Sequence, residues 1–205
     1  MKRVGLLGGA FNPPHQAHLR LARLALDHLD LDELRVVPTA LSPHKPTLDD
    51  PGPEARLALL ARAFEGFDAR LRLEPLELAR GGTSYTVDTL EALAAREPDT
   101  AWILVMGSDQ LPGLPAWRRP ERVFALASAA VALRPGSPFE VPAGAHLRAV
   151  PAWSGGPGEL VALPATELDL ASSAIRADLH GRPDRDPAGL PTQVLATIRA
   201  ENLYR

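Results

Sequence analysis

The stretch GLLGGAFNPPHQAHL, residues 5–19, indicates how the chain folds. A short apolar run ends in two adjacent glycines, Gly8 and Gly9, which is typical of a buried parallel strand that turns sharply at its end. Pro13 and Pro14 stiffen this turn, and we expect the helix to begin at Pro14 because proline suits the first helical position. The stretch therefore predicts a strand that passes almost directly into a helix.

Strand and helix patterns alternate along the rest of the chain. Short apolar or alternating runs predict strands at Val4–Gly8, Glu33–Thr39, Arg70–Leu78, Ala101–Gly107 and Ser128–Gly136, with others within residues 146–151 and 160–170. Apolar residues at helical spacing predict helices within residues 15–29, 54–64, from about Thr86, 172–180 and 190–204. This alternation predicts an α/β fold with a doubly wound, mostly parallel sheet and helices on both faces. No repeat or long linker divides the chain, so we expect one domain over residues 1–205.

Composition excludes several classes of function. The net charge of −3 offers no general attraction to nucleic acid, although local basic residues can still bind small anions. The chain has no cysteine, so disulfides, thiolate metal sites and cysteine nucleophiles are excluded. The start of the chain makes a poor signal peptide, and no apolar run reaches the ~18 residues of a membrane helix, so we expect a cytoplasmic protein without a membrane partner. The sequence leaves a homo-oligomer open.

The opening stretch is best interpreted as a phosphate site. A helix that begins after the glycines presents unpaired amides and a positive dipole end to an anion, and His15 and His18 lie three residues apart in its first turn. A dinucleotide fingerprint (GxGxxG) and a P-loop (GxxxxGK[ST]) both fail to match. A zinc pair would need a third ligand from elsewhere in the chain. Metal ligation and histidines without a role remain the alternatives.

A second cluster, SSAIR, carries two hydroxyls and a guanidinium. Ser172 and Ser173 at a predicted helix start can cap the helix or donate to phosphate oxygens, and Arg176 follows one turn later. The alternative is a plain serine cap with a solvated arginine. Because ligands of doubly wound sheets bind at the carboxyl ends of the strands, we expect this cluster to meet the His15 and His18 turn there.

Three further clusters follow predicted strands or open a helix. Asp109 lies just after the buried strand that ends at Gly107, where its carboxylate can hold a ribose hydroxyl or a magnesium-bound water, and Trp117 can provide a stacking surface for a ring. The alternative is a helix cap and a tryptophan that covers core. Lys45 can meet a second phosphate, or it is simply solvated, and Thr86 caps a helix whose free amides can bind a carboxylate.

Taken in order, these motifs match a known family. The segments GGAFNPPHQAH, SPHKP, SYTVDTL, GSDQLPGLPAWRRP and ASSAIR together resemble bacterial nicotinate-nucleotide adenylyltransferases, and LATIRAENLY resembles the closing helix of that family. SYTVDTL and GSDQLPGLPAW are the more specific segments, since the histidine and serine–arginine motifs occur throughout the wider nucleotidyltransferase superfamily. The resemblance implies a Rossmann-like fold and the reaction of ATP with nicotinate mononucleotide in NAD biosynthesis.

The resemblance also implies roles for individual residues. The residues that it places on ATP are Gly8, Gly9, Ala10, Phe11, His15, His18, Gly107, Asp109, Ser172, Ser173 and Arg176, with His18 and His15 at the reacting phosphate. Those that it places on the mononucleotide are Lys45, Tyr85, Thr86, Asp109 and Trp117, with Trp117 on the pyridine ring. Mg²⁺ is expected to arrive on the phosphates of ATP, largely through water, with no ligand from the protein.

The chain departs from the family pattern at three positions. Ala17 stands where the family usually has glycine, Ala171 where it has the first serine of its later motif, and Ser173 where it has threonine. A role for that first serine therefore does not carry over. The alternatives that the sequence leaves open are an adenylyltransferase for nicotinamide mononucleotide or phosphopantetheine, and a non-catalytic nucleotide sensor on the same fold.

Overall fold

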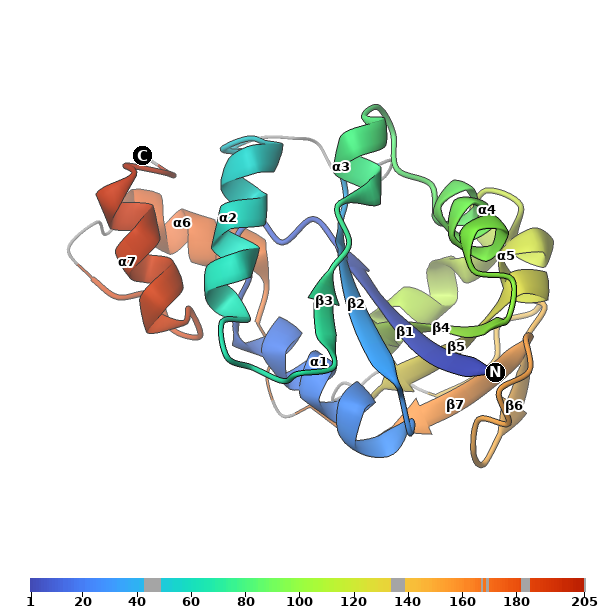
Figure 1. Cartoon of the computed structure of the whole chain (residues 1–205). Helices are drawn as coiled ribbons and strands as arrows, with labels where there is room; N and C mark the ends of the chain where they lie inside the picture. Colours follow the sequence, from blue (N-terminus) through green and yellow to red (C-terminus); the bar gives the residue numbers. More distant parts are fainter. Residues whose placement is uncertain (43–48, 134–138, 167, 169, 182–184, 205) are drawn as a thin grey trace.

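The computed structural model describes residues 1–42, 49–133, 139–166, 168, 170–181 and 185–204, and these residues form a Rossmann-like α/β fold (Figure 1). Within the described ranges, seven strands form one sheet in the order β3-β2-β1-β4-β5-β7-β6, and every neighbouring pair is parallel. The strands are β1 (Lys2–Gly9), β2 (Glu33–Pro38), β3 (Leu71–Leu73), β4 (Thr100–Gly107), β5 (Ala127–Ala132), β6 (Arg148–Val150) and β7 (Glu159–Leu163). The prediction of a doubly wound parallel sheet is confirmed.

Helices lie between consecutive strands from β1 to β5 and after β7. They are α1 (Gln16–His28), α2 (Pro53–Ala63), α3 (Leu76–Arg80), α4 (Thr86–Arg96), the 3₁₀ helix η1 (Ser108–Ala116), α5 (Pro120–Leu126), α6 (Ser172–Gly181) and α7 (Thr192–Ala200). Within the described residues, no helix is both long and apolar enough to cross a lipid bilayer.

The strand order reverses between β1 and β4, and we call the carboxyl ends of these two strands the crevice, because ligands of doubly wound sheets bind at such a reversal. From β1 the chain builds outward through β2 and β3, then returns to pair β4 with the other side of β1 and continues through β5. At such a reversal the two connections leave on opposite faces of the sheet, which opens a gap at the carboxyl ends of the central strands. Gly9 and Gly107 are the last residues of these two strands. These two predicted ligand residues therefore lie at the reversal.

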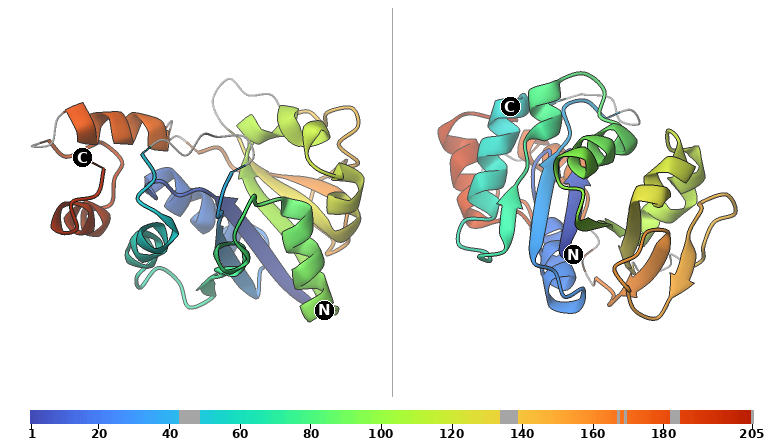
Figure 2. Two further views of the ribbon diagram at one scale, coloured as in Figure 1. Left: turned by 90° about the horizontal axis from the view of Figure 1, so that it is seen from above. Right: turned by 45° about the vertical axis from the view of Figure 1, so that its right-hand side comes forward.

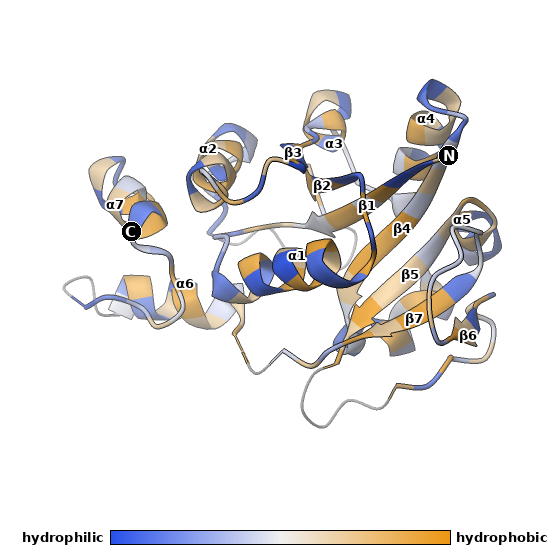
Figure 3. Ribbon diagram, turned by 60° about the horizontal axis from the view of Figure 1, so that its bottom comes forward, coloured by the Kyte–Doolittle hydropathy of each residue, from blue (hydrophilic) through white to orange (hydrophobic). Residues whose placement is uncertain are grey.

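Alternate residues of the central strands pack against helices on the two faces of the sheet. In β4, Ile103 and Val105 contribute to a core with α1, α2 and α7, whereas Trp102 and Leu104 contribute to a core with α4, η1 and α5. Figure 2 shows the sheet and its helices from two further sides, and Figure 3 shows β4 and β5 largely in the hydrophobic colour. The predicted covering of both faces is confirmed.

Some element boundaries differ from the sequence prediction. The predicted strand Arg70–Leu78 is wrong beyond Leu73, because Pro75 has no N–H to continue a ladder and α3 begins at Leu76 instead. Its alternating pattern comes from an edge strand that pairs only with β2 and ends after three residues. The strand expected within residues 146–151 is present as β6. The last residues of the predicted strand Ser128–Gly136 lie outside the described part of the chain, and β5 ends at Ala132.

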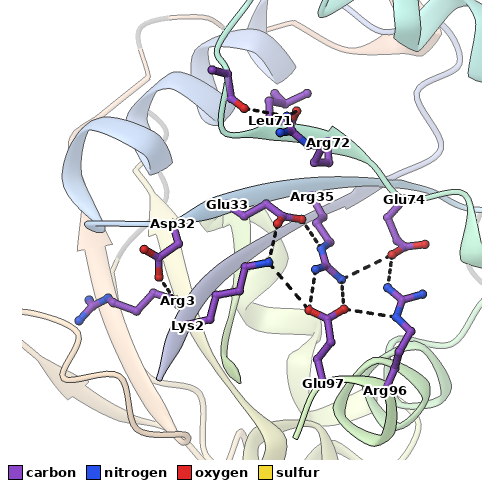
Figure 4. A network of polar contacts seen from close by, with 11 residues as sticks. Lys2, Arg3, Asp32, Glu33, Arg35, Leu71, Arg72, Glu74, Arg96 and Glu97 are labelled. Atoms are coloured by element: carbon purple, nitrogen blue, oxygen red, sulfur yellow. Dashed lines mark hydrogen bonds and ion pairs between the residues drawn. The ribbon is translucent and has the colours of Figure 1, made fainter. Parts of the chain in front are cut away.

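Charged side chains form a network at the amino ends of β1 and β2 (Figure 4). The Arg35 side chain, only 7% exposed, donates to both carboxylate oxygens of Glu97 at 2.7 Å and to Glu33 at 2.6 Å. Lys2 adds an ion pair to Glu33 at 2.6 Å. The hydrogen bonds from Arg35 lower the pKa of Glu97 to about 2, so this carboxylate stays charged over a wide pH range. The network ties β1, β2 and the end of α4 together on the edge of the sheet opposite the crevice.

Candidate active site

The turn after β1 is strained and closely packed. Phe11 has a φ of +48°, which is uncommon for a bulky residue, and its ring is buried. A Cβ atom added to Gly9 would lie 3.2 Å from the Phe11 ring, so the ring occupies the place of a side chain there. A Cβ atom added to Gly8, in contrast, would meet no atom of the described chain within 4 Å. Gly8 therefore borders open space beside the crevice, where a ligand can approach the backbone.

The two histidines of the opening motif are in contact. His15 is the N-cap of α1, and its backbone N–H donates to Nδ1 of His18 at 3.1 Å. The rings stack with 3.8 Å between their centroids, and the Phe11 ring meets His18 edge-on at 4.8 Å. Because Nδ1 of His18 accepts a hydrogen bond, the neutral ring carries its proton on Nε2. His18 therefore presents an N–H donor of the kind that binds a phosphate oxygen.

The start of α1 differs from the prediction. The helix begins at Gln16 and not at Pro14, because His15 takes the extended conformation of an N-cap (φ −144°, ψ 172°). Both histidines thus belong to the first turn and its cap, as their spacing indicated, but Pro14 lies before the helix.

The SSAIR cluster of α6 contacts the same turn, more than 150 residues away in the sequence. The Ser172 hydroxyl donates to the carbonyl oxygen of Pro13 at 3.1 Å, and Nη1 of Arg176 donates to the carbonyl oxygen of Asn12 at 2.7 Å. Nε of Arg176 is buried and has no hydrogen-bond partner within the described chain. A buried donor without a partner costs free energy, so this guanidinium is suited to an anion that arrives with a ligand.

The hydroxyls of this cluster are not helix caps. The N–H of Ile175 donates to the carbonyl oxygen of Ala171 at 3.2 Å, so Ala171 occupies the cap position and the prediction of Ser172 as the cap is wrong. Ser172 is the first residue of α6 and Ser173 the second, and Ser173 is exposed.

The motif SYTVDTL lies at the carboxyl end of β2. The Ser84 hydroxyl accepts from the N–H of Ala40 at 3.0 Å, and the N–H of Ser84 donates to the carbonyl oxygen of Leu41 at 2.9 Å. The next residue, Tyr85, is the N-cap of α4, and Thr86 is its first residue. The prediction that Thr86 caps this helix is therefore wrong by one residue, while the helix start itself is confirmed.

The segment after β4 carries Gly107, Asp109 and Trp117. Gly107 is the N-cap of η1, and Asp109 is exposed in its first turn, where it accepts a hydrogen bond from the Gln110 amide at 2.8 Å. Trp117 directly follows η1 and is half-buried, its ring parallel to the Phe124 ring at 6.5 Å.

Arg118, the residue after Trp117, brings the segment after η1 into contact with the start of α4. The Arg118 guanidinium lies 4.6 Å from the centroid of the Tyr85 ring, so Trp117 and Tyr85 come from adjoining segments. The structure thus brings two sets of predicted residues to the carboxyl edge of the sheet, one around β1 and α6 and one around β2, α4 and η1. Lys45 lies outside the described residues.

The sequence did not predict the role of Arg56, which holds the loops after β1 and β2 in place. Its side chain is 1% exposed and donates to the carbonyl oxygens of Ala10 (2.9 Å), Thr39 (2.7 Å) and Ala40 (3.1 Å). It also pairs with Asp50 at 3.0 Å. An arginine on a surface helix gives no sequence signal for such a role. Asn12 and Tyr204, whose side chains meet at 2.7 Å, were missed for the same reason.

The donors around the crevice suit phosphate better than a resident metal. They are imidazole and guanidinium N–H groups, hydroxyls and backbone amides, all of which donate hydrogen bonds to anions. Among the residues that the structure describes, no three histidines, aspartates or glutamates are grouped so as to hold a metal ion.

Comparisons with known proteins identify the family. Residues 6–178 match the cytidylyltransferase-like family. A protein of Bordetella petrii named "Probable nicotinate-nucleotide adenylyltransferase" is 36% identical, with 100% of both chains covered. A protein of the same name from Chromobacterium violaceum is 40% identical, with 99% of both chains covered, and one from Halalkalibacterium halodurans is 35% identical, with 100% of this chain and 92% of that protein covered.

A solved structure supports the fold. The nicotinic acid mononucleotide adenylyltransferase of Plasmodium falciparum, solved in complex with NaAD, superposes with a TM-score of 0.76 at 17% identity and covers 100% of this chain and 98% of its own. At this identity the likeness concerns the fold alone.

Proposed function

The chain belongs to the nicotinate-nucleotide adenylyltransferase family, and we propose that it transfers the adenylyl group of ATP to nicotinate mononucleotide, giving deamido-NAD and pyrophosphate. One observation supports this proposal above the others. Imidazoles at the start of α1 and the Arg176 guanidinium of α6 meet at a single turn, beside the open space at Gly8. Such a set of donors at a helix N-terminus suits a triphosphate.

The reaction needs no nucleophile from the protein. A phosphate oxygen of nicotinate mononucleotide attacks the α-phosphorus of ATP in line, a new P–O bond forms, and the bond to the β-phosphate oxygen breaks with pyrophosphate as the leaving group. The negative charge moves from the attacking phosphate to pyrophosphate. Catalysis then consists of positioning the two substrates and stabilising charge on the phosphates.

His18 is the residue that we assign to the reacting phosphate. Its Nδ1 is engaged by the backbone N–H of His15, so its Nε2–H can donate to an α-phosphate oxygen. The stacked His15 ring assists by fixing the orientation of His18 and by lining the same site. Gly8–Phe11 provide the backbone against which the nucleotide lies, and Gly107 allows the adenosine to approach β4.

The remaining assignments divide the residues by substrate. Ser172, Ser173 and Arg176 bind the β- and γ-phosphates, and this assignment is supported by the buried Nε of Arg176, which has no hydrogen-bond partner among the described residues. On the other side of the crevice, Tyr85, Thr86 and Trp117 bind the mononucleotide, and Trp117 stacks on its pyridine ring. The family resemblance assigns Lys45 to the same substrate. Asp109, exposed in the first turn of η1, contacts both substrates through ribose hydroxyls.

We assign Mg²⁺ to the substrate and not to the protein. Bound to ATP, Mg²⁺ neutralises part of the phosphate charge, and its ligands are then phosphate oxygens and water. The donors of His18 and Arg176 at the turn after β1 then bind the phosphate charge that Mg²⁺ does not neutralise. We also propose that the protein works in the cytoplasm, where its nucleotide substrates are available.

The test is pyrophosphate release from ATP and Mg²⁺ with each of two mononucleotides. Nicotinate mononucleotide should give turnover at least tenfold above that with nicotinamide mononucleotide. A preference for the amide would overturn the substrate assignment, and turnover with phosphopantetheine in place of either would assign the chain to another branch of the superfamily. Folded protein that binds ATP without turnover would indicate a sensor.

A further inference from the structure

Tyr204 makes a contact that the proposed mechanism does not use. This residue follows α7, is only 7% exposed, and its hydroxyl donates to Oδ1 of Asn12 at 2.7 Å. The two residues are 192 positions apart in the sequence. Asn12 follows directly after the strained Phe11, in the turn that leads to His15 and His18. A side chain after the last described helix is thus anchored in the phosphate turn.

The Asn12 residue is held on three sides. Tyr204 fixes the oxygen of its side-chain amide, and its Nδ2 group makes a long contact of 3.5 Å to the carbonyl oxygen of Asp49. Its own carbonyl oxygen accepts from Arg176 at 2.7 Å. These contacts come from three separate segments, so they fix both the side chain and the backbone of Asn12.

The next residues of the turn are held by the same part of the chain. Ser172 binds the carbonyl oxygen of Pro13, and the N–H of Gln16 donates to the carbonyl oxygen of Gly189 at 2.8 Å. The turn from Asn12 to Gln16 is therefore bounded by α6, the segment before α7 and the segment after it. Figure 1 shows α6 and α7 together at the side of the molecule that faces α2.

The backbone around Tyr204 indicates that this arrangement is enforced. Tyr204 has a φ of +59°, in the left-handed region that bulky residues rarely adopt, whereas the φ of +54° at Asn202 belongs to the ordinary cap that ends α7. The turn is closed by the N–H of Leu203, which donates to the carbonyl oxygen of Ile198 at 3.0 Å. A bulky residue persists in this conformation only where contacts hold it, and the hydrogen bond from Tyr204 to Asn12 is one such contact.

The chemistry of the contact suits a permanent anchor. Burial and the nearby charge of Asp50 raise the pKa of Tyr204 well above its ordinary value, although Arg176 and Arg56 act in the opposite sense. The phenol therefore keeps its proton and remains a donor to Asn12 at any working pH.

We infer that Tyr204 is a positioning residue for ATP, which acts by holding Asn12 and through it the turn that carries Phe11 and the histidine pair. The inference rests on the proposed function only in taking this turn as the phosphate site. Tyr204 itself does not reach the reacting atoms. Its effect passes through the buried Phe11 ring, which contacts His18 edge-on at 4.8 Å, and through the Asn12 carbonyl group, which orients Arg176.

Calorimetric titration of ATP–Mg²⁺ into the full chain, without mononucleotide, tests this inference. Tyr204→Phe removes the hydroxyl group and leaves the ring, so the expected result is a Kd for ATP raised roughly three- to tenfold, the range of one lost hydrogen bond. The Kd for nicotinate mononucleotide should change less than twofold, because the described residues that we assign to it lie around α4 and η1, away from Tyr204. A matched control is Thr197→Val, which removes an α7 hydroxyl whose partner is the Gln193 carbonyl group, away from the turn.

A double-mutant cycle with Asn12→Ala separates positioning from general stability. Asn12→Ala should raise the Kd for ATP by a similar factor, and adding Tyr204→Phe should raise it no further. A purely structural role would instead lower the Tm of Tyr204→Phe while leaving its Kd for ATP within twofold of the unchanged protein, and that outcome overturns the inference, as does full additivity.

Two further outcomes keep the test decisive. If Tyr204→Phe does not fold, Asn12→Ala alone decides, since an unchanged Kd for ATP would show that the anchored residue does not affect the phosphate turn. If the unchanged protein binds ATP but releases no pyrophosphate with nicotinate mononucleotide, the proposed function fails while the effect of Tyr204 on ATP affinity can still be measured.

Discussion

Replacing His18 separates two contributions of one side chain. Its Nδ1 atom accepts from the backbone N–H of the N-cap residue His15, and its Nε2–H is the donor assigned to the α-phosphate. Asparagine can place an oxygen near the position of Nδ1 but has no group at the position of Nε2. His18→Asn therefore keeps the capping contact and loses the phosphate donor, whereas His18→Ala loses both.

The magnitudes follow from these contacts. Both variants should lose roughly 10²–10⁴ in kcat, the range for one charge-stabilising or acid–base group. Both also lose the ring contacts with His15 and Phe11, worth about 0.5–1.5 kcal/mol. His18→Ala alone loses the cap, which costs about 1 kcal/mol more and lowers its Tm by a further ~2–4 °C in a chain of this size.

The assay combines pyrophosphate release at saturating substrates with thermal unfolding of each variant. Near-normal turnover in His18→Asn would refute the assignment of Nε2 as the phosphate donor. Equal Tm values for the two variants would refute the capping contribution. A fall in kcat that follows the loss of Tm, so that His18→Asn is much more active than His18→Ala, would show that the turn needs the cap and not the donor.

Three other perturbations have defined outcomes. Gly8→Ala adds a Cβ atom to open space, so we expect an unchanged or slightly higher Tm and a Kd for ATP raised at least tenfold by titration. The folded-state pKa of Glu97 is about 2, against 4.5 for an ordinary glutamate, so the stabilisation of the fold by its charge is present above about pH 4.5 and is lost as the pH falls. Arg35→Met should therefore weaken the fall in the free energy of unfolding at acid pH. Urea unfolding between pH 7 and 2 measures this. Chelation of Mg²⁺ by EDTA should abolish turnover and leave the Tm within 1 °C, since we propose that the ion enters with ATP.

The sheet could be predicted because its signals are local. Buried strands such as Ala101–Gly107 are continuous apolar runs that end in glycine, and the structure has β4 over nearly the same residues. The prediction failed for Arg70–Leu78, where alternation extends past the point at which Pro75 ends the strand. An alternating pattern records which side chains face the core, and a short edge strand followed by a short helix can satisfy the same pattern.

The candidate site could be predicted only as far as its residues carry signals of their own. Glycines, paired histidines and a serine–arginine motif mark their positions in the chain, and strand order predicts that they meet. Arg56 gives no such signal, because its role depends on three carbonyl groups from two loops that approach it only in the folded chain. The contact between Asn12 and Tyr204 is likewise a product of tertiary structure.

The two edges of the sheet are built for different purposes. At the amino edge, Arg35 is saturated by Glu33 and Glu97, and these charges hold one another in place (Figure 4). At the carboxyl edge, Gly8 borders open space and Arg176 keeps a buried nitrogen without a partner among the described residues. Satisfied groups contribute to stability, whereas an unsatisfied donor at a site costs stability that a ligand can restore.

ATP should therefore raise the Tm of the unchanged protein, and an Arg176→Met variant should show a smaller rise. Arg35→Met should show a lower starting Tm but the same rise, and an equal loss of the ATP effect in both variants would contradict this division of the two edges.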